Sequence, residues 1–491
     1  MLACNDTRPS QDQDALAATR GWRPARQPAR AAWLGLAVGA LGLTLLVAVA
    51  ACTADGGYIP DGAVANAGGM GAGGAGAGGA GAGGAGAGGS TCFPATGGTG
   101  GQPTVTAPAC IMPAKWLGAL AKPTPLVSVG RPVTTNSTEQ ANVGLIVDGK
   151  YHVANGLLLT PVAGAPKWVS IDMGTGYTKL LLGWQDVGYQ DYGPSFYTAT
   201  DYKNATSPVG YLIKTSADSS NGDDGTWTTV VTVTDNPVRA RTHLIPFAGM
   251  KWVRFEVTAA GLDASGAARA VQLDEIEVRD FSAIGDSDPT DGYFIMGDSI
   301  TKVSFNRTGG PNELDRLITA QRPAYTPALV EAGNGGETLN HALLHLQDNQ
   351  WLTYAEGLTF VTLAYGTNDS WGSNTAAGAG FEATLRSIIK LLTDARRVPI
   401  LPRIPWNTVG AHVDDFNAVI DKLQLEFELP CGPDLYGLVA AHPEYVQGVA
   451  TVQADCTVKY SGDGEHPQSA VAKTAIQQAY ADAVLPLYPA P

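Results

Sequence analysis

Basic residues are scarce in this sequence. Its 491 residues include 31 Lys and Arg against 45 Asp and Glu, so the formal net charge is −14. Proteins that bind nucleic acid need basic surfaces to displace phosphate counterions, so the sequence excludes nucleic acid as an expected partner. The chain also lacks a long run of like charge, which excludes a polyelectrolyte tail.

The first 51 residues predict a secretory leader. Five arginines, the last at Arg30, precede an uncharged apolar run over 31–51 that ends in small residues, the order typical of a signal peptide. The run is also long enough for a spanning helix, which is the alternative. Its end, VAAC at 49–52, resembles a bacterial lipobox, which implies that Cys52 is lipidated. We therefore predict a lipid anchor in the membrane of the cell envelope, with the protein facing the periplasm or the cell exterior.

Cysteine is also scarce in this sequence. None of the six cysteines belongs to a CxxC motif or a Cys/His cluster, so no zinc site is expected. Apart from Cys4 and Cys52, an even number remains, which in an exported chain indicates disulfides. Sequence order suggests the pairs Cys92–Cys110 and Cys431–Cys456, although four cysteines permit three pairings.

Glycine is abundant instead, and much of it lies in residues 52–112. Repeats of GAGGA fill 71–90, and a segment of this composition cannot bury a core. We predict a flexible tether that holds a folded body away from a membrane. The length of the whole chain suggests two or three domains, at roughly 150 residues per domain.

Short alternating strands dominate residues 113–281, which predicts an all-β sandwich. The segment resembles a discoidin-like, galactose-binding-type jelly roll in "GRPV…VDGKY", "PKWVSIDMG" and "LDEIEVRD", which implies a carbohydrate-binding domain. An aromatic stretch over 184–202 either stacks on sugar rings or closes the sandwich core. The expected strands are 168–173, 177–184, 211–215, 227–233, 252–257 and 271–278.

After a linker, 282–291, strands alternate with helices over 292–491. This pattern predicts an α/β domain with a doubly wound parallel sheet, in which ligands bind at the carboxyl ends of the strands. The expected strands are 293–296, 328–331, 358–364 and 400–404, and the expected helices are 312–321, 337–347, 381–397, 414–427 and 470–485.

A candidate nucleophile follows the first of these strands. Ser299 lies in Gly-Asp-Ser-Ile at a strand-to-helix turn, where a nearby base can activate its hydroxyl. The same Gly-Asp-Ser occurs at 285–287, which we interpret as linker. Of the seven histidines only His466 has an aspartate, Asp463, three residues before it, so His466 is the candidate base and Asp463 its orienting partner. No HExxH motif accompanies the other helical histidines, and no metal is expected.

Two further positions suit the stabilisation of an oxyanion. The amide of Asn368, at the end of the strand 358–364, is expected to point toward the serine hydroxyl. Gly336, just before a helix, offers a backbone N–H and permits close approach of a ligand. Taken singly, Asn368 is equally well a turn former and Gly336 a helix cap.

Together, the four motifs resemble the blocks of the SGNH (GDSL-type) hydrolases. GDSI resembles GDSL, GNGGET resembles G-x-S-G-D-T, GTND resembles G-x-N-D, and DGEH resembles D-x-x-H. The resemblance implies Ser299 as nucleophile, His466 as base, Asp463 as its partner, and an oxyanion hole of Asn368, Gly336 and the Ser299 N–H. It implies no metal and no organic cofactor. The departures from the family pattern are Ile300, Gly335 and Glu337.

A jelly roll before an SGNH domain resembles the arrangement of carbohydrate acetyl esterases. We therefore expect a monomeric serine esterase acting on an acylated carbohydrate or another small ester, with Trp371, Arg403 and Trp406 lining the substrate pocket. The alternatives are a lipolytic enzyme (a lysophospholipase or short-chain carboxylesterase) and a non-catalytic carbohydrate-binding lipoprotein. Since every catalytic motif follows residue 284, we expect that part alone to hydrolyse a small soluble ester.

Overall fold

The computed structural model describes most of the chain from Cys110 to Ala490. The predicted leader, lipidation site and tether up to residue 109 lie outside the described residues, and so do Cys92 and Cys456. Among the described helices, none is both long enough and apolar enough to cross a membrane. The residues not described within this range are 139, 152–155, 163–164, 188–191, 194–205, 264, 306–309, 349, 372–376, 411, 454–457 and 468.

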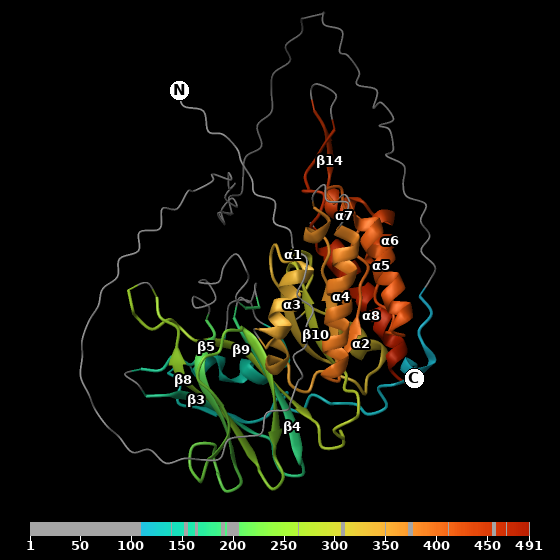
Figure 1. Cartoon of the computed structure of the whole chain (residues 1–491). Helices are drawn as coiled ribbons and strands as arrows, with labels where there is room; N and C mark the ends of the chain where they lie inside the picture. Colours follow the sequence, from blue (N-terminus) through green and yellow to red (C-terminus); the bar gives the residue numbers. More distant parts are fainter. Residues whose placement is uncertain are drawn as a thin grey trace, which may run out of the picture. The chain divides into compact units, whose positions relative to one another are not determined.

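Two antiparallel sheets follow the first described residues (Figure 1). One has the strand order β1-β3-β8-β5-β6 and the other the order β2-β9-β4-β7. Alternate residues of both sheets, such as Val169 of β3 and Leu180 of β4, enter one apolar core, as the period-two pattern predicts. A sandwich of antiparallel sheets is therefore present, while the closer resemblance to a jelly roll stays a prediction. The strands are β1 (Val133–Thr135), β2 (Leu157–Leu158), β3 (Lys167–Asp172), β4 (Lys179–Asp186), β5 (Pro208–Ser216), β6 (Thr228–Val233), β7 (Ala240–Pro246), β8 (Trp252–Ala260) and β9 (Gln272–Asp280).

Four parallel strands with the order β11-β10-β12-β13 form the centre of the α/β body. Phe294 and Met296 of β10 pack toward α3, α4 and α5, whereas Tyr293 and Ile295 of the same strand pack toward α2 and α8. Helices thus cover both faces, as the doubly wound prediction requires. The strands are β10 (Gly292–Gly297), β11 (Ala328–Gly333), β12 (Phe360–Ala364) and β13 (Val398–Ile400), and the helices are α1 (Ser299–Ser304), α2 (Leu314–Gln321), α3 (Leu339–Gln347), α4 (Ala377–Asp394), α5 (Val413–Glu426), α6 (Leu435–Ala441), α7 (Glu444–Gln447) and α8 (Ala470–Val484).

The order of the sheet locates a crevice for a ligand. β11 lies on one side of β10 and β12 on the other, so the chain reverses direction across the sheet at β10. The loops that leave the carboxyl ends of these three strands therefore meet at one switch point, where doubly wound sheets bind ligands. The last strand, β13, overlaps the expected strand 400–404 only at Ile400, where it ends. Pro402 and Pro405, which cannot donate to a ladder, lie in the part that was expected to be strand.

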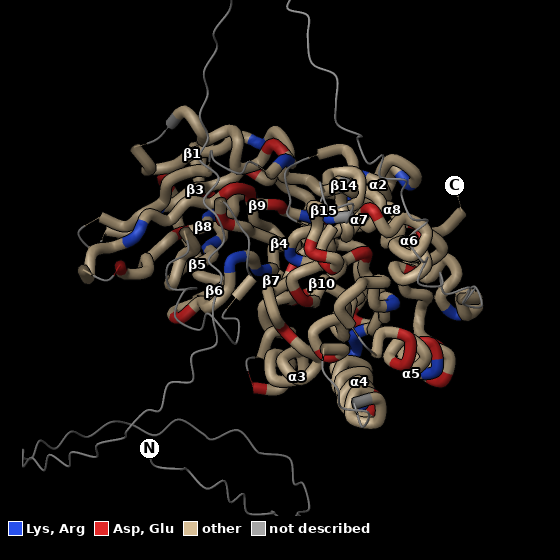
Figure 2. The backbone as a smooth tube through the Cα atoms, turned by 90° about the horizontal axis from the view of Figure 1, so that it is seen from above, with Lys and Arg blue, Asp and Glu red and all other residues tan. Residues whose placement is uncertain are grey.

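Helices α4 and α5 are joined at the surface by pairs of opposite charge. Arg386 of α4 forms ion pairs with Glu382 and with Glu426 of α5, and Lys422 of α5 pairs with Glu382. Acidic and basic positions accordingly lie side by side on these two helices (Figure 2). Exposed pairs of this kind contribute at most about 1 kcal/mol each, so the apolar stripes of the helices hold them to the sheet.

The sandwich and the α/β body share an apolar core. Leu181 of β4, Ala240 of β7 and Ile284 of the predicted linker belong to the same buried cluster as Phe294 of β10. Polar contacts cross the same boundary, since the guanidinium of Arg279 donates to the backbone oxygens of Thr326 and Pro327. This packing argues against the expectation that residues from 284 onward fold and work alone.

The predicted pairing of the cysteines is wrong for both described cysteines, because Cys110 is bonded to Cys431. The reason is the path of the chain after Cys110, which runs along the α/β body before it enters the sandwich. Trp116 donates its indole N–H to the backbone oxygen of Glu428, and the Leu120 N–H donates to the oxygen of Leu487. Nearness in sequence therefore misled the prediction. Short 3-10 helices and a two-stranded sheet complete the fold. The helices are η1 (Ala114–Trp116), η2 (Gln140–Val147), η4 (Trp351–Tyr354), η5 (Asn368–Ser370) and η6 (Leu485–Leu487), and the sheet consists of β14 (Ala450–Val452) and β15 (Val458–Tyr460).

Candidate active site

A serine, a histidine and an aspartate form a hydrogen-bonded line at the switch point. The Oγ of Ser299 lies 2.8 Å from Nε2 of His466, and Nδ1 of the same ring lies 2.7 Å from Oδ2 of Asp463. Ser299 is the first residue of α1, directly after β10, and the other two residues precede α8. The structure thus brings together all three residues that the sequence proposed as a triad, although 167 positions separate Ser299 from His466.

A tight turn fixes the aspartate against the histidine. Oδ1 of Asp463 accepts hydrogen bonds from the backbone N–H groups of Glu465 and His466, which leaves Oδ2 for the ring. Partial burial raises the pKa of Asp463, but these N–H groups and the ring outweigh it, so that the pKa lies below its ordinary value. Gly464 has φ +84° and its backbone oxygen accepts from the Thr408 N–H, so only glycine suits this turn.

The residue before the serine caps helix α1. Asp298 is 1% exposed, and its Oδ1 accepts from the Ile300 N–H, which satisfies one of the free donors of the first turn. The pKa of Asp298 is raised to about 8, above all by burial. The Ile300 N–H opposes this rise, and the carboxylates of Glu465, Asp369 and Glu337 add to it. Asp298 therefore holds a proton at neutral pH, directly beside the candidate nucleophile.

Asn368 and Gly336 lie in the loops after β12 and β11, one on each side of the serine strand in the sheet order. Nδ2 of Asn368 donates to the backbone oxygen of Glu337 at 2.8 Å, so the GTND and GNGGET motifs are joined directly. Gly336 has φ +73°, which explains why a glycine precedes Glu337. Both residues are partly exposed and so lie within reach of solvent. Their role as oxyanion donors remains a prediction.

The three residues predicted to line the pocket differ in their surroundings. Trp371, which follows η5, is 55% exposed, and Trp406 packs half-buried against the core. Arg403 is held in ion pairs by Asp421 and Asp434 and lies over the ring of Tyr436. The charge of Arg403 is thus compensated by the protein, and the residue also lines a small cavity behind α1. Its part in binding a substrate stays a prediction.

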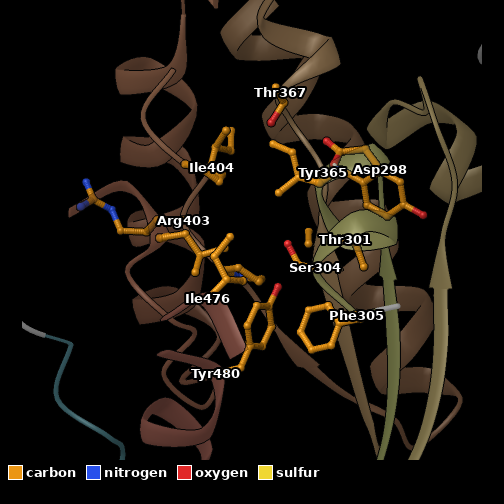
Figure 3. A pocket seen from close by; sticks show the side chains of 15 residues that line it. Asp298, Thr301, Ser304, Phe305, Tyr365, Thr367, Arg403, Ile404, Ile476 and Tyr480 are labelled. Carbon is orange, nitrogen blue, oxygen red and sulfur yellow. Dashed lines mark hydrogen bonds between the residues drawn. The ribbon is translucent and has the colours of Figure 1, made fainter. Parts of the chain in front are cut away.

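A cavity of about 20 Å³ lies behind α1 (Figure 3). Asp298, Thr301 and Ser304 contribute polar atoms to it, and Ile476 and Tyr480 of α8 supply apolar walls. This volume is enough for about one water molecule. Neither Ser299 nor His466 lines it, so its size does not limit the acyl group that reaches the serine.

The aromatic stretch predicted as a sugar platform is partly buried. Trp184 is 3% exposed and packs edge-on against Tyr211 in the sandwich core, and Tyr192 is fully buried. Neither ring can stack on a sugar. The other aromatic residues of the stretch, Tyr189, Phe196, Tyr197 and Tyr202, lie outside the described residues.

The two helical histidines of α3 have partners within the protein. His341 accepts from the Thr338 N–H at the start of the helix. The buried His345 lies 2.8 Å from Oε1 of Glu337 and stacks on Trp351. The sequence analysis missed Glu337 and Asn334 as parts of this site, although both belong to the GNGGET motif. The sequence signal that could have found them is their place, an amide and a carboxylate between an apolar strand and a helix, in the same motif as Gly336.

No protein-family model and no curated protein sequence matches this chain. Solved structures do: a lipase/acylhydrolase from Enterococcus faecalis is 20% identical, with TM-score 0.31, over 40% of this chain and 95% of that one. An acetylxylan esterase from Geobacillus stearothermophilus is 18% identical, with TM-score 0.30, over 39% and 93%. A chitosan-binding module from a Paenibacillus chitosanase/glucanase is 21% identical, with TM-score 0.22, over 31% and 98%. At these identities and TM-scores, the likenesses support no activity for this chain.

Proposed function

We propose that this protein is a serine esterase of the SGNH type. The observation that carries the proposal is the continuous hydrogen-bonded line from Ser299 through His466 to Asp463 at the switch point of a parallel sheet. Such a line is what removal of the serine proton by a neutral imidazole requires, since the carboxylate holds the ring in the correct tautomer. The amide of Asn368 and the N–H groups of Gly336 and Ser299 are the proposed oxyanion donors.

The reaction follows from this arrangement. Oγ of Ser299 attacks the ester carbonyl carbon while Nε2 of His466 accepts its proton, and the carbonyl oxygen becomes the oxyanion. Collapse of this intermediate expels the alcohol, which takes the proton from His466. A water molecule then attacks the acyl carbon while Nε2 of His466 accepts one of its protons. His466 returns this proton to Oγ of Ser299 as the acyl–oxygen bond breaks, which releases the acid and restores the serine.

We propose O-acetyl groups on carbohydrates as the substrate. Trp371, more than half exposed beside η5, offers an aromatic face of the kind that stacks on a sugar ring. The resemblance of the sandwich to carbohydrate-binding jelly rolls agrees with this substrate class.

The test compares Ser299→Ala with the parent on three substrates: acetylated xylan, p-nitrophenyl acetate and a lysophospholipid. The proposal requires turnover of the two acetyl esters by the parent and none by the variant. Turnover of lysophospholipid in preference to both would make the enzyme lipolytic. No turnover of any ester by the parent, together with binding to xylan, would make the protein a non-catalytic binding lipoprotein.

We further propose that the protein is anchored through lipid on Cys52 and faces the periplasm or the cell exterior. The support is the sequence VAAC at 49–52 after an apolar run. Incorporation of radioactive fatty acid into the parent and its loss in Cys52→Ala is the expected result. Label that persists in the variant would reject the anchor.

A further inference from the structure

A single buried residue links the serine loop, the oxyanion loop and the sandwich. Asn334, the first residue after β11, is fully buried. Its backbone N–H donates to the oxygen of Gly297, two residues before the nucleophile. Its side-chain Nδ2 donates to Oε1 of Glu337 at 3.1 Å, and its Oδ1 accepts the backbone N–H of Tyr192 at 3.0 Å. Both ends of the amide are thus engaged, which fixes its orientation.

Glu337 connects Asn334 to Asn368, the proposed oxyanion donor. Its side chain is held by Asn334 and by His345, and its own exposure is 0%. Its backbone oxygen accepts the Nδ2 of Asn368 at 2.8 Å. The direction of that amide is therefore set by a residue whose side chain is locked. The same lock acts on the peptide that joins Gly336 to Glu337.

Tyr192, which supplies the N–H for Asn334, belongs to the connection between β4 and β5 of the sandwich. Its ring lies edge-on against Phe294 of β10, with centroids 5.6 Å apart, and against Trp351, with centroids 5.0 Å apart. Its backbone oxygen accepts from the Arg239 N–H at 2.8 Å. The sandwich thus holds Tyr192 on one side while its ring is packed into the α/β body on the other.

We propose that Tyr192 is a positioning residue of the hydrolase: through Asn334 and Glu337 it sets the orientation of the Asn368 amide. The sandwich is then part of the catalytic apparatus. This inference rests on the proposed function. Its physical basis is that oxyanion donors act only when they are preorganised, and a misplacement of about 1 Å can cost about 10²-fold in rate.

The test is a double-mutant cycle in the full-length protein, with p-nitrophenyl acetate as substrate. Tyr192→Ala keeps the backbone N–H but removes the ring whose packing against Phe294 and Trp351 holds that N–H in place. It is expected to lower kcat roughly 10- to 100-fold with KM changed less than about threefold, because transition-state and not ground-state contacts are weakened. Asn368→Ala is expected to lower kcat by about 10²-fold or more. In the Asn368→Ala background, Tyr192→Ala should cost less than about threefold, since the group through which it acts is gone. A double variant whose loss is the product of the two single losses would overturn the proposal.

A matched control separates positioning from general stability. Thr242→Val removes the hydrogen bond from Thr242 to the backbone oxygen of Glu356, which also joins the sandwich to the α/β body but lies outside the Asn334 network. Its kcat should equal that of the parent. An equal fall of kcat in both variants would mean that any weakening of the boundary slows the enzyme, and the proposal would be wrong.

If Tyr192→Ala does not fold, as judged by near-ultraviolet circular dichroism, Asn334→Asp takes its place in the cycle. This change keeps an oxygen for the Tyr192 N–H and the size of the side chain, but it replaces the donor to Glu337 by a second acceptor. Parent kinetics, or full additivity with Asn368→Ala, would again overturn the proposal. Ser299→Ala distinguishes the two levels: if that variant keeps its activity, the proposed function itself fails, whatever the cycle shows.

Discussion

The chain contains Gly-Asp-Ser twice, and the two copies lie in opposite surroundings. Gly297 ends a buried strand at the centre of a parallel sheet, Asp298 and Ser299 begin the helix that follows, and the serine is hydrogen-bonded to His466. Ser287, in the other copy, lies exposed in a turn closed by hydrogen bonds between Gly285 and Asp288. The three letters are the same in both. What precedes them, an apolar strand or a surface turn, decides whether a catalytic site can be built there.

The largest expected difference between the two copies is in the activity lost when the serine is replaced. Ser299→Ala is expected to lower kcat by about 10³-fold or more, the scale seen when a triad member is removed, whereas Ser287→Ala keeps parent activity. Rates of p-nitrophenyl acetate hydrolysis at saturating substrate give the comparison. A dead Ser287→Ala alongside an active Ser299→Ala would move the site into the turn and refute the assignment.

The next largest effect concerns Asp463, for which the exposed copy has no counterpart. Asp463→Asn is expected to reduce kcat by roughly 10²- to 10⁴-fold with KM little changed, because the imidazole loses its orientation and its charge partner. His466→Ala should in addition abolish the rise of kcat/KM with pH that a base must show as it loses its proton. Profiles of kcat/KM against pH for parent and variants provide the measurement. A parent-like profile in His466→Ala would mean that another group is the base.

Asp298 and Asp286, the aspartates of the two copies, should differ in how the free energy of unfolding depends on their protonation. The folded state holds the proton of Asp298 up to about pH 8, whereas an unfolded chain loses it near the ordinary value of 3.8. Between these limits the unfolded state binds fewer protons, so the free energy of unfolding falls as pH rises. Asp298→Asn should therefore raise Tm relative to the parent more at pH 8 than at pH 5.

The matched variant is Asp286→Asn, since the side chain of Asp286 is fully exposed. It should shift Tm equally little at both values of pH. Asp369 and Asp291, whose pKa values burial raises to about 6, leave some pH dependence in every variant. A gap between Asp298→Asn and the parent that does not widen toward pH 8 would contradict the burial of a protonated carboxyl.

The smallest expected difference is in the stability lost when Gly297 or Gly285 is replaced by alanine. A methyl group on Gly297 would collide with the Thr301 side chain and meet Ala364 at 3.0 Å, so Gly297→Ala should cost about 1–3 kcal/mol of unfolding free energy through overpacking. Gly285 lies in an exposed turn, and Gly285→Ala should change it by about 0.5 kcal/mol at most. Urea denaturation measures both. Equal costs would mean that the strand end is looser than the contacts around Gly297 imply.

Much of the α/β body could be predicted from the sequence, because three of its apolar strands, β10, β11 and β12, each run into a polar motif. The parallel sheet brings those strand ends to one edge, so Ser299, Gly336 and Asn368 needed only the order of the strands to be placed together. His466 needed the aspartate three residues before it. The catalytic roles of these residues still await measurement.

The boundary between the two bodies could not be predicted in this way. Periodicity shows that a residue such as Tyr192 or Leu181 is apolar and buried, but it does not say against which partner. Tyr192 was assigned to a sugar platform or to the sandwich core, yet its contacts are with Asn334 and Phe294, more than 100 positions away. The Cys110–Cys431 bond spans 321 positions, and the predicted pairing was wrong for the same reason. Contacts of this range depend on how two folded surfaces meet, which no local pattern encodes.

The Cys110–Cys431 bond also has a mechanical consequence. Any tension applied to the chain ahead of Cys110 passes through this covalent link into the segment that follows α5, without stretching the strands of the sandwich that come next in sequence. For a protein held by its N-terminal side, the load therefore enters the α/β body at Cys431. The stretch between the two cysteines, which includes Tyr192 and Ser299, is bypassed by the disulfide and bears no tension along its backbone from that side.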